Sequence, residues 1–63
     1  QQINDLLANR PQSLMELSQQ MFPDAMAEGA IFLVLSEVIG YLDWGLQEGT
    51  IQLDESKMVY REV

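Results

Sequence analysis

Residues 35–51, LSEVIGYLDWGLQEGTI, predict a long helix that ends at a glycine and continues directly into a strand. Apolar residues recur with the helical period from about residue 25 or 30 to Glu48. The residues expected to face the core are Ile31, Leu35, Val38 and Leu42, flanked by Val34, Ile39, Gly45 and Leu46. Gly49 follows the last periodic residue, where a left-handed C-cap is expected. A long helix that turns straight into a small hairpin is typical of a winged-helix domain.

An amphipathic helix is expected at the start of the chain. Its apolar stripe consists of Ile3, Leu6 and Leu7, which are spaced i, i+3, i+4. Pro11 ends this helix, because the residue before a proline avoids helical geometry. The tight turn that follows favours a helix-turn-helix start.

The second helix begins with a capping-box pattern. Ser13 and Glu16 have the spacing at which each side chain can bond to the other residue's backbone N–H. Pro23 ends this helix. Residues 23–29 leave two possibilities: Asp24 caps the start of the third helix, or Gly29 marks a break before it.

Two short segments of alternating polarity after Gly49 predict a hairpin, joined by the polar loop of residues 54–57. With this loop length, Leu53 pairs with Met58 and Ile51 pairs with Tyr60. These four side chains are expected to face the helices, and a register slip of one residue would reverse the faces.

These elements together predict a small α+β winged helix, with three helices followed by a two-stranded antiparallel β-wing. We expect residues 1–63 to be a single winged-helix domain. The chain begins with glutamine and not methionine, so we expect it to be a C-terminal fragment of a longer protein. At 48% hydrophobic, the chain is too apolar for a disordered segment.

The charge balance argues against nucleic-acid binding. Ten acidic residues stand against three basic ones, Arg10, Lys57 and Arg61, which gives a net charge of −7. The chain has no Cys and no His, so it can form neither a disulfide framework nor a Ser–His or Cys–His nucleophile system. We therefore expect no catalytic, cofactor-binding or metal-binding residue in this chain, no membrane span, and a cytoplasmic location.

A second stripe of the third helix suggests an interface. Leu33, Glu37, Gly40 and Trp44 are spaced i, i+4, i+7, i+11, roughly opposite the core face. A large apolar residue at each end and a flat glycine between them suggest a surface that another domain or subunit covers. We assign the interface to Leu33, Gly40 and Trp44, with Phe32 beside them. The alternative is that Trp44 packs inside this fold, against the first helix or the wing.

The chain resembles the C-terminal winged-helix domain of a branch of metallo-β-lactamase-fold hydrolases, the branch related to glyoxalase II and lactamase-like protein beta-2. In that domain the third helix typically has the pattern Glu-x-x-x-His-Leu-x-x-Leu-x-x-x-Gly, followed by an apolar strand. The positions that match here are Glu37, Leu42, Glu48, Gly49 and Ile51. Tyr41 stands in place of the His, and Gly45 in place of the second Leu. Glu16 and Phe22 match the two ends of the family's preceding helix.

The resemblance implies a parent protein that is a zinc-dependent hydrolase of thioesters, phosphoesters or related substrates. The family's zinc ligands lie in the His-x-His-x-Asp-His motif of the preceding domain, and this chain contains none of them. The chain would be a non-catalytic accessory domain that serves packing, dimerisation or shaping of the substrate entrance. Its partner would be the preceding catalytic domain or a second subunit.

Two other functions stay open. In a transcription regulator, the third helix and Lys57 would approach DNA. In a protein-interaction winged helix, the acidic surface would bind a basic partner. Steep loss of DNA affinity with rising salt would support the first of these alternatives.

Overall fold

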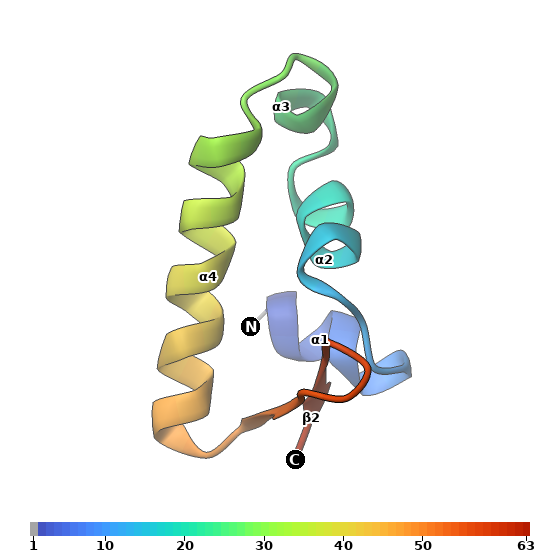
Figure 1. Ribbon diagram of the computed structural model, residues 1–63, viewed down its shortest axis with the longest axis vertical. Coiled ribbons are helices and arrows are strands. Elements are labelled where there is room, and N and C mark those ends of the chain that lie inside the picture. The colour runs from blue at the N-terminus through green and yellow to red at the C-terminus, as the bar shows by residue number, and fades with distance from the viewer. Residues whose placement is uncertain (1) are drawn as a thin grey trace.

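The structure is a computed structural model, and it describes residues 2–63. Its elements follow in the order α1 (Gln2–Asn9), α2 (Leu14–Met21), α3 (Pro23–Ala27), α4 (Ile31–Glu48), β1 (Ile51–Asp54) and β2 (Val59–Glu62). Figure 1 shows α4 running alongside α2 and α3. Helix α3 lies near the N-terminal end of α4, and α1 and the hairpin lie near its C-terminal end. The described chain is therefore a small α+β structure in which helices precede a two-stranded antiparallel sheet.

The capping box at the start of α2 is confirmed. The Glu16 backbone N–H donates to Ser13 Oγ at 3.1 Å, and the Ser13 N–H donates to Glu16 Oε1 at 2.9 Å. These two bonds satisfy backbone donors that the first turn of a helix would otherwise leave unpaired. The helix ends at Met21, two residues before Pro23.

The segment after α2 forms a short helix of its own, so the described residues contain four helices and not the expected three. Pro23 occupies the first turn of α3, and Phe22 is the N-cap without a side-chain bond, so a cap at Asp24 is wrong. Gly29 then adopts a φ of 88° and breaks the chain before α4 begins at Ile31. A left-handed residue at this position favours glycine, which has no Cβ to clash.

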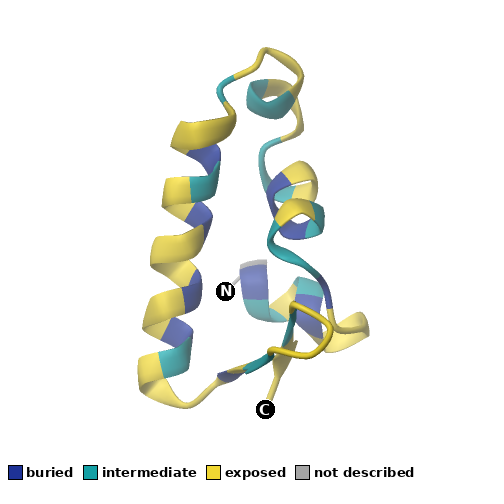
Figure 2. Cartoon of the chain, viewed as in Figure 1, coloured by how far each residue is buried: buried dark blue, intermediate teal, exposed yellow. Residues whose placement is uncertain are grey.

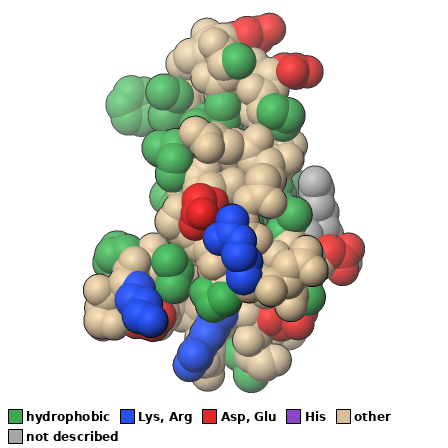
Figure 3. All heavy atoms as spheres, turned by 90° about the vertical axis from the view of Figure 1, so that its right-hand side faces the viewer, with side chains coloured by type: hydrophobic (Ala, Val, Ile, Leu, Met, Phe, Trp, Pro, Cys, Tyr) green, Lys and Arg blue, Asp and Glu red, His purple; other side chains and the backbone are tan. Residues whose placement is uncertain are grey.

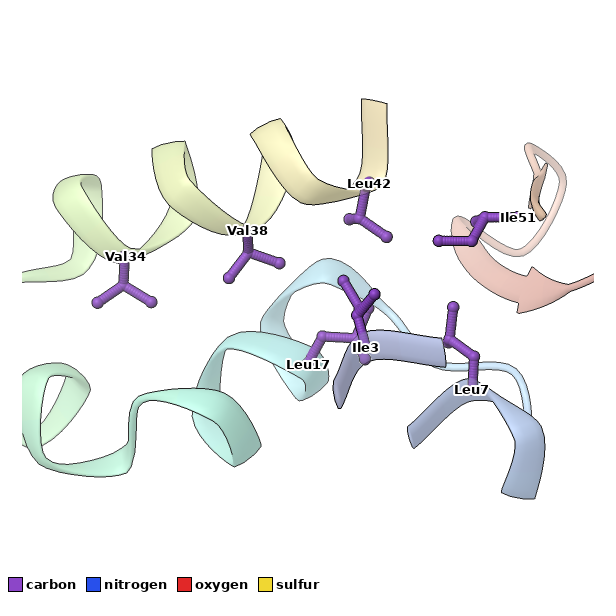
Figure 4. Packing of buried hydrophobic residues seen from close by; sticks show 7 residues of the cluster. All are labelled: Ile3, Leu7, Leu17, Val34, Val38, Leu42 and Ile51. Carbon is purple, nitrogen blue, oxygen red and sulfur yellow. The ribbon is translucent and has the colours of Figure 1, made fainter. Parts of the chain in front are cut away.

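One core cluster lies between α4 and the elements beside it. Its members are Ile3, Leu7, Leu17, Val34, Val38, Leu42 and Ile51. Figure 4 shows the three residues of α4 pointing toward the elements that face this helix, and Figure 2 shows that the buried residues of α4 lie on one side.

The residues of α4 that face the core differ in part from the predicted set. Val38 and Leu42 are buried as expected, but Val34 is buried too, whereas Ile31 remains 39% exposed. Ile31 lies on the correct side of α4 but in its first turn, where it lines an open hollow with residues of α2 and α3. The neighbouring elements do not close over it.

The hairpin register differs from the prediction by two residues. Leu53 pairs with Tyr60, and Ile51 pairs with Glu62, so both predicted pairs are wrong. The reason is Met58, which adopts a φ of 54° and belongs to the turn, where it is 66% exposed. Because the shift is an even number of residues, the faces of the strands are preserved. Ile51 is buried, and Leu53 and Tyr60 are half-buried.

Asp54 shapes the turn of the hairpin. Its Oδ1 accepts hydrogen bonds from the Ser56 hydroxyl at 2.7 Å and from the Ser56 backbone N–H at 3.2 Å. These bonds hold the pKa of the Asp54 carboxyl below its usual value, with the Ser56 hydroxyl as the main cause. Aspartate commonly begins turns through such local bonds.

Gln12 ties the turn between α1 and α2 to the hairpin. It forms an isolated antiparallel bridge with Tyr60, with backbone N···O distances of 2.9 and 2.7 Å. The Gln12 side chain is almost fully buried, its Nε2 donates to the Leu6 carbonyl at 2.8 Å, and its Oε1 accepts from Gln20 Nε2. The Leu6 carbonyl lies in the last turn of α1, where carbonyls lack helical partners.

Candidate functional site

The first turn of α4 is apolar on all sides. Residues 31–35 are all apolar, and successive helical residues point about 100° apart, so together they surround the helix axis. Val34 is buried, but Phe32 is 86% exposed and Leu33 is 77% exposed. A helix that is apolar all round is normally covered all round. Here the described residues cover one side only, as Figure 2 shows.

The predicted outer stripe borders two shallow, open hollows between side chains on the surface of α4. One hollow is lined by Leu33, Val34, Ser36 and Glu37. The next is lined by Ser36, Glu37, Gly40, Tyr41 and Trp44. The two hollows share Ser36 and Glu37, so together they extend along α4 from Leu33 to Trp44. We call this surface the α4 groove.

Trp44 lies on the surface of this groove. Its side chain is 55% exposed, so the alternative that Trp44 packs inside the fold is wrong. Glu37, Gly40, Tyr41 and Trp44 are spaced i, i+3, i+4, i+7 along the helix. Four residues at this spacing form the hole that receives one side chain of a facing helix in knobs-into-holes packing.

Phe32 lies apart from the α4 groove. Around the helix it is displaced from Trp44 by about a third of a turn, and it does not line either hollow of the groove. The structure thus brings Leu33, Gly40 and Trp44 to one groove and places Phe32 on a different flank of α4, on the same stripe as Ile39 about two turns further along.

The two glycines inside α4 have different surroundings. A Cβ on Gly45 would lie 2.4 Å from Ile51 Cδ1 and 3.2 Å from Ile51 Cβ, so the strand β1 requires a glycine there. A Cβ on Gly40 would meet nothing within 4 Å. A glycine in a helix costs about 1 kcal/mol relative to alanine. Of the two glycines in α4, the described residues leave no room for a side chain at Gly45 but leave it at Gly40.

Acidic side chains occur both on α4 and on the other elements, whereas the cationic side chains lie away from α4. Helix α4 carries Glu37, Asp43 and Glu48 and no Lys or Arg. Figure 3 shows the face turned away from α4, where Lys and Arg side chains gather around the hairpin and the turn between α1 and α2. A partner that docks on α4 therefore meets a surface with acidic groups only.

One ion pair joins described residues. Arg10 Nη1 lies 3.2 Å from Glu16 Oε2, and both side chains are about half exposed. The Ser13 backbone N–H is the main cause that lowers the pKa of Glu16, and the Arg10 guanidinium lowers it further. This pair neutralises one of the three cations of the chain.

Within residues 2–63, no group of three His, Cys, Asp or Glu residues is arranged to hold a metal ion. In the same residues, every buried side-chain nitrogen and oxygen has a hydrogen-bond partner. None of the helices in this part of the chain combines the length and the apolar character that crossing a membrane requires.

Sequence reasoning found Leu33, Gly40 and Trp44 through their spacing, but it missed Tyr41 and Ser36 as groove residues. Both lie next to the stripe on the helix surface, so a wider arc around Gly40 would have included them. In comparisons with known proteins, no family model matches the chain, and neither a curated protein nor a solved structure shows significant similarity to it.

Proposed function

We propose that this chain is a non-catalytic docking domain whose α4 groove packs against the surface of another protein. The observation that carries the proposal is the exposure of Leu33 and Trp44 along the same face of α4. Complete burial of a large apolar side chain contributes about 1.5–3 kcal/mol, so covering this face would yield a substantial binding free energy.

The sequence resemblance indicates the class of protein to which the partner would belong. We propose that the domain is the C-terminal winged-helix accessory domain of a metallo-β-lactamase-fold hydrolase, and that α4 docks on the catalytic domain or a second subunit. The order of helices before a hairpin and the left-handed C-cap at Gly49 are consistent with that fold. The zinc content of the natural gene product that contains these residues tests this part. One or two zinc ions per polypeptide would support it, and a metal-free product would contradict it.

A protein-interaction domain with a basic partner is a second candidate. It is favoured by the acidic residues of α4, which has no Lys or Arg of its own. The same observation argues against a DNA-binding regulator, because α4 would bring Glu37, Asp43 and Glu48 toward phosphates. We expect no binding of duplex DNA even at low salt. A measurable affinity for DNA that falls steeply with salt would favour the DNA-binding regulator over the protein-interaction domain.

Docking at α4 is tested by thiol labelling in living cells. Leu33→Cys introduces a thiol in the α4 groove, and Glu55→Cys introduces one at the exposed tip of the hairpin as a matched control. The chain has no other cysteine, so the modified peptides are identified directly by mass spectrometry. We expect N-ethylmaleimide to label position 33 several times more slowly than position 55 in the natural gene product. Equal rates would mean that the groove is uncovered, and the docking proposal would fail.

A further inference from the structure

We propose that the α4 groove receives an arginine side chain of the docked protein, bound between Glu37, Tyr41 and Trp44 above Gly40. This inference rests on the proposed docking function and specifies the chemistry of the partner. The site is the hollow that these four residues line together with Ser36.

The chemistry of the lining fits a guanidinium group. Trp44 and Tyr41 supply aromatic faces, on which a planar cation stacks favourably. Glu37 supplies a carboxylate, which accepts the paired N–H groups of arginine. Gly40 has no side chain, and the space above it is open, so the floor of the hollow admits a flat group. Both aromatic side chains are partly exposed and therefore accessible, Trp44 at 55% and Tyr41 at 41%.

The electrostatics of the chain also favour a cationic occupant. Glu37 forms no salt bridge with any described residue, and the Lys and Arg side chains gather on the side away from α4. Leu33 borders the adjoining hollow, so the residue next to the arginine in the partner is expected to be apolar.

A second copy of this chain fits the groove less well. Each copy has a net charge of −7, which opposes self-association. Antiparallel pairing of two α4 helices about the middle of the groove would also bring Glu37 of both copies to the same seam. The partner is therefore a different protein surface that presents an arginine beside an apolar residue.

The test is a titration of the full chain with N-acetyl-arginine methylamide. Binding is followed by NMR through the indole N–H of Trp44, the single tryptophan of the chain. The citrulline analogue has nearly the same shape without the charge, and the lysine analogue has the charge without the planar group. We expect a dissociation constant of the order of 10 mM for the arginine probe, and binding about fivefold weaker for each of the other two.

Three variants complete the design. Glu37→Gln is expected to abolish the preference for arginine over citrulline. Glu48→Gln removes the same charge from the end of α4, outside the hollow, and is expected to retain the preference. Gly40→Leu places a side chain in the hollow, at a position where a Cβ meets nothing within 4 Å, and is expected to abolish binding of all three probes.

Equal affinity of the wild-type chain for the arginine and citrulline probes would overturn the proposal, and so would a lack of binding at 100 mM probe (about ten times the expected dissociation constant). A dimer in sedimentation equilibrium that buries Trp44 would overturn it as well, because a second copy would then occupy the groove. The two probe titrations do not bear on thiol protection at position 33. The titration can therefore contradict the arginine proposal while the docking proposal stands, and the labelling experiment tests the docking proposal separately.

Discussion

At Gly45, helix α4 passes so close to β1 that even a methyl group would overlap the Ile51 side chain, whose Cδ1 atom would lie 2.4 Å away. Ile51 is 2% exposed and has little room to move aside. At Gly40 the corresponding space is open. The same residue type on the same helix therefore has a packing role at one position and leaves a surface hollow at the other.

This contrast predicts opposite effects of alanine. Gly45→Ala is expected to lower the free energy of unfolding by about 1–2 kcal/mol, because overpacking outweighs the gain in helix propensity. Gly40→Ala is expected to raise it by up to about 1 kcal/mol. Urea unfolding followed by far-ultraviolet circular dichroism measures both. A stabilising Gly45→Ala would show that Ile51 relaxes without cost.

Gln12 is the residue whose importance the sequence least suggests, because it is a single polar residue in a turn. Its side chain is almost fully buried and satisfies the Leu6 carbonyl. Gln12→Leu keeps the backbone bridge to Tyr60 but leaves that carbonyl without its partner. We expect a loss of about 1–3 kcal/mol in the free energy of unfolding. Gln19→Leu, at an exposed position of α2, is the control and is expected to change it by less than about 0.5 kcal/mol.

At the scale of elements, helix α2 depends on its first turn. The Glu16 carboxylate accepts the Ser13 N–H and pairs with Arg10. Both interactions favour the ionised form, so the pKa of Glu16 is lower in the folded chain than in the unfolded chain. A carboxylate with a lowered pKa stabilises the fold above its unfolded pKa, and this contribution is lost as the pH falls through the folded value.

We therefore expect Glu16→Gln to make stability less dependent on pH in the acidic range. The wild-type chain should lose stability as the pH falls below about 4.3, the usual value for glutamate, and the variant should lose less. Thermal unfolding at a series of pH values between neutrality and strong acid measures this difference. Glu48→Gln, at an exposed end of α4, is the control. Parallel curves for wild type and Glu16→Gln would show that the capping carboxylate does not contribute.

The elements with strong local signals were predicted well. The capping box of Ser13 and Glu16 and the C-cap at Gly49, which has a φ of 80°, are confirmed. The hairpin register was missed because nothing in the sequence indicates that Met58 takes a left-handed conformation, which costs a non-glycine residue energy. The separate helix α3 was left open because Pro23 favours a helix start and Gly29 favours a break, and in the structure both effects occur.

For the molecule as a whole, the long helix contributes one face to the core and leaves another uncovered. The core needs only part of the circumference of α4, namely Val34, Val38 and Leu42. Leu46 also packs against the core, whereas Phe32, Leu33 and Trp44 stay exposed. Periodicity predicted a second apolar stripe because it showed more apolar positions than one core face uses, but it did not predict the hollow that Gly40 lines with Tyr41 and Ser36.

If the outer face serves docking and not folding, then polar substitutions there should spare stability. Leu33→Gln is expected to change the free energy of unfolding by less than about 0.5 kcal/mol, because the side chain is 77% exposed. The matched substitution Leu17→Gln, at a fully buried position, is expected to unfold the chain. In the natural gene product, Leu33→Gln should weaken the association that protects the groove, measured as faster hydrogen exchange along α4. Unchanged exchange would place the docking contact elsewhere.

The exposure of Trp44 also determines what its fluorescence reports. The single tryptophan of the chain is already 55% exposed in the folded state, so unfolding changes its contact with water only modestly. Its emission is therefore a poor indicator of whether the chain is folded, and a denaturation curve recorded from tryptophan fluorescence would have a small amplitude. Covering the groove, in contrast, would remove the indole from water and shift its emission to the blue. If α4 docks on another protein as proposed, the emission of Trp44 would report that association.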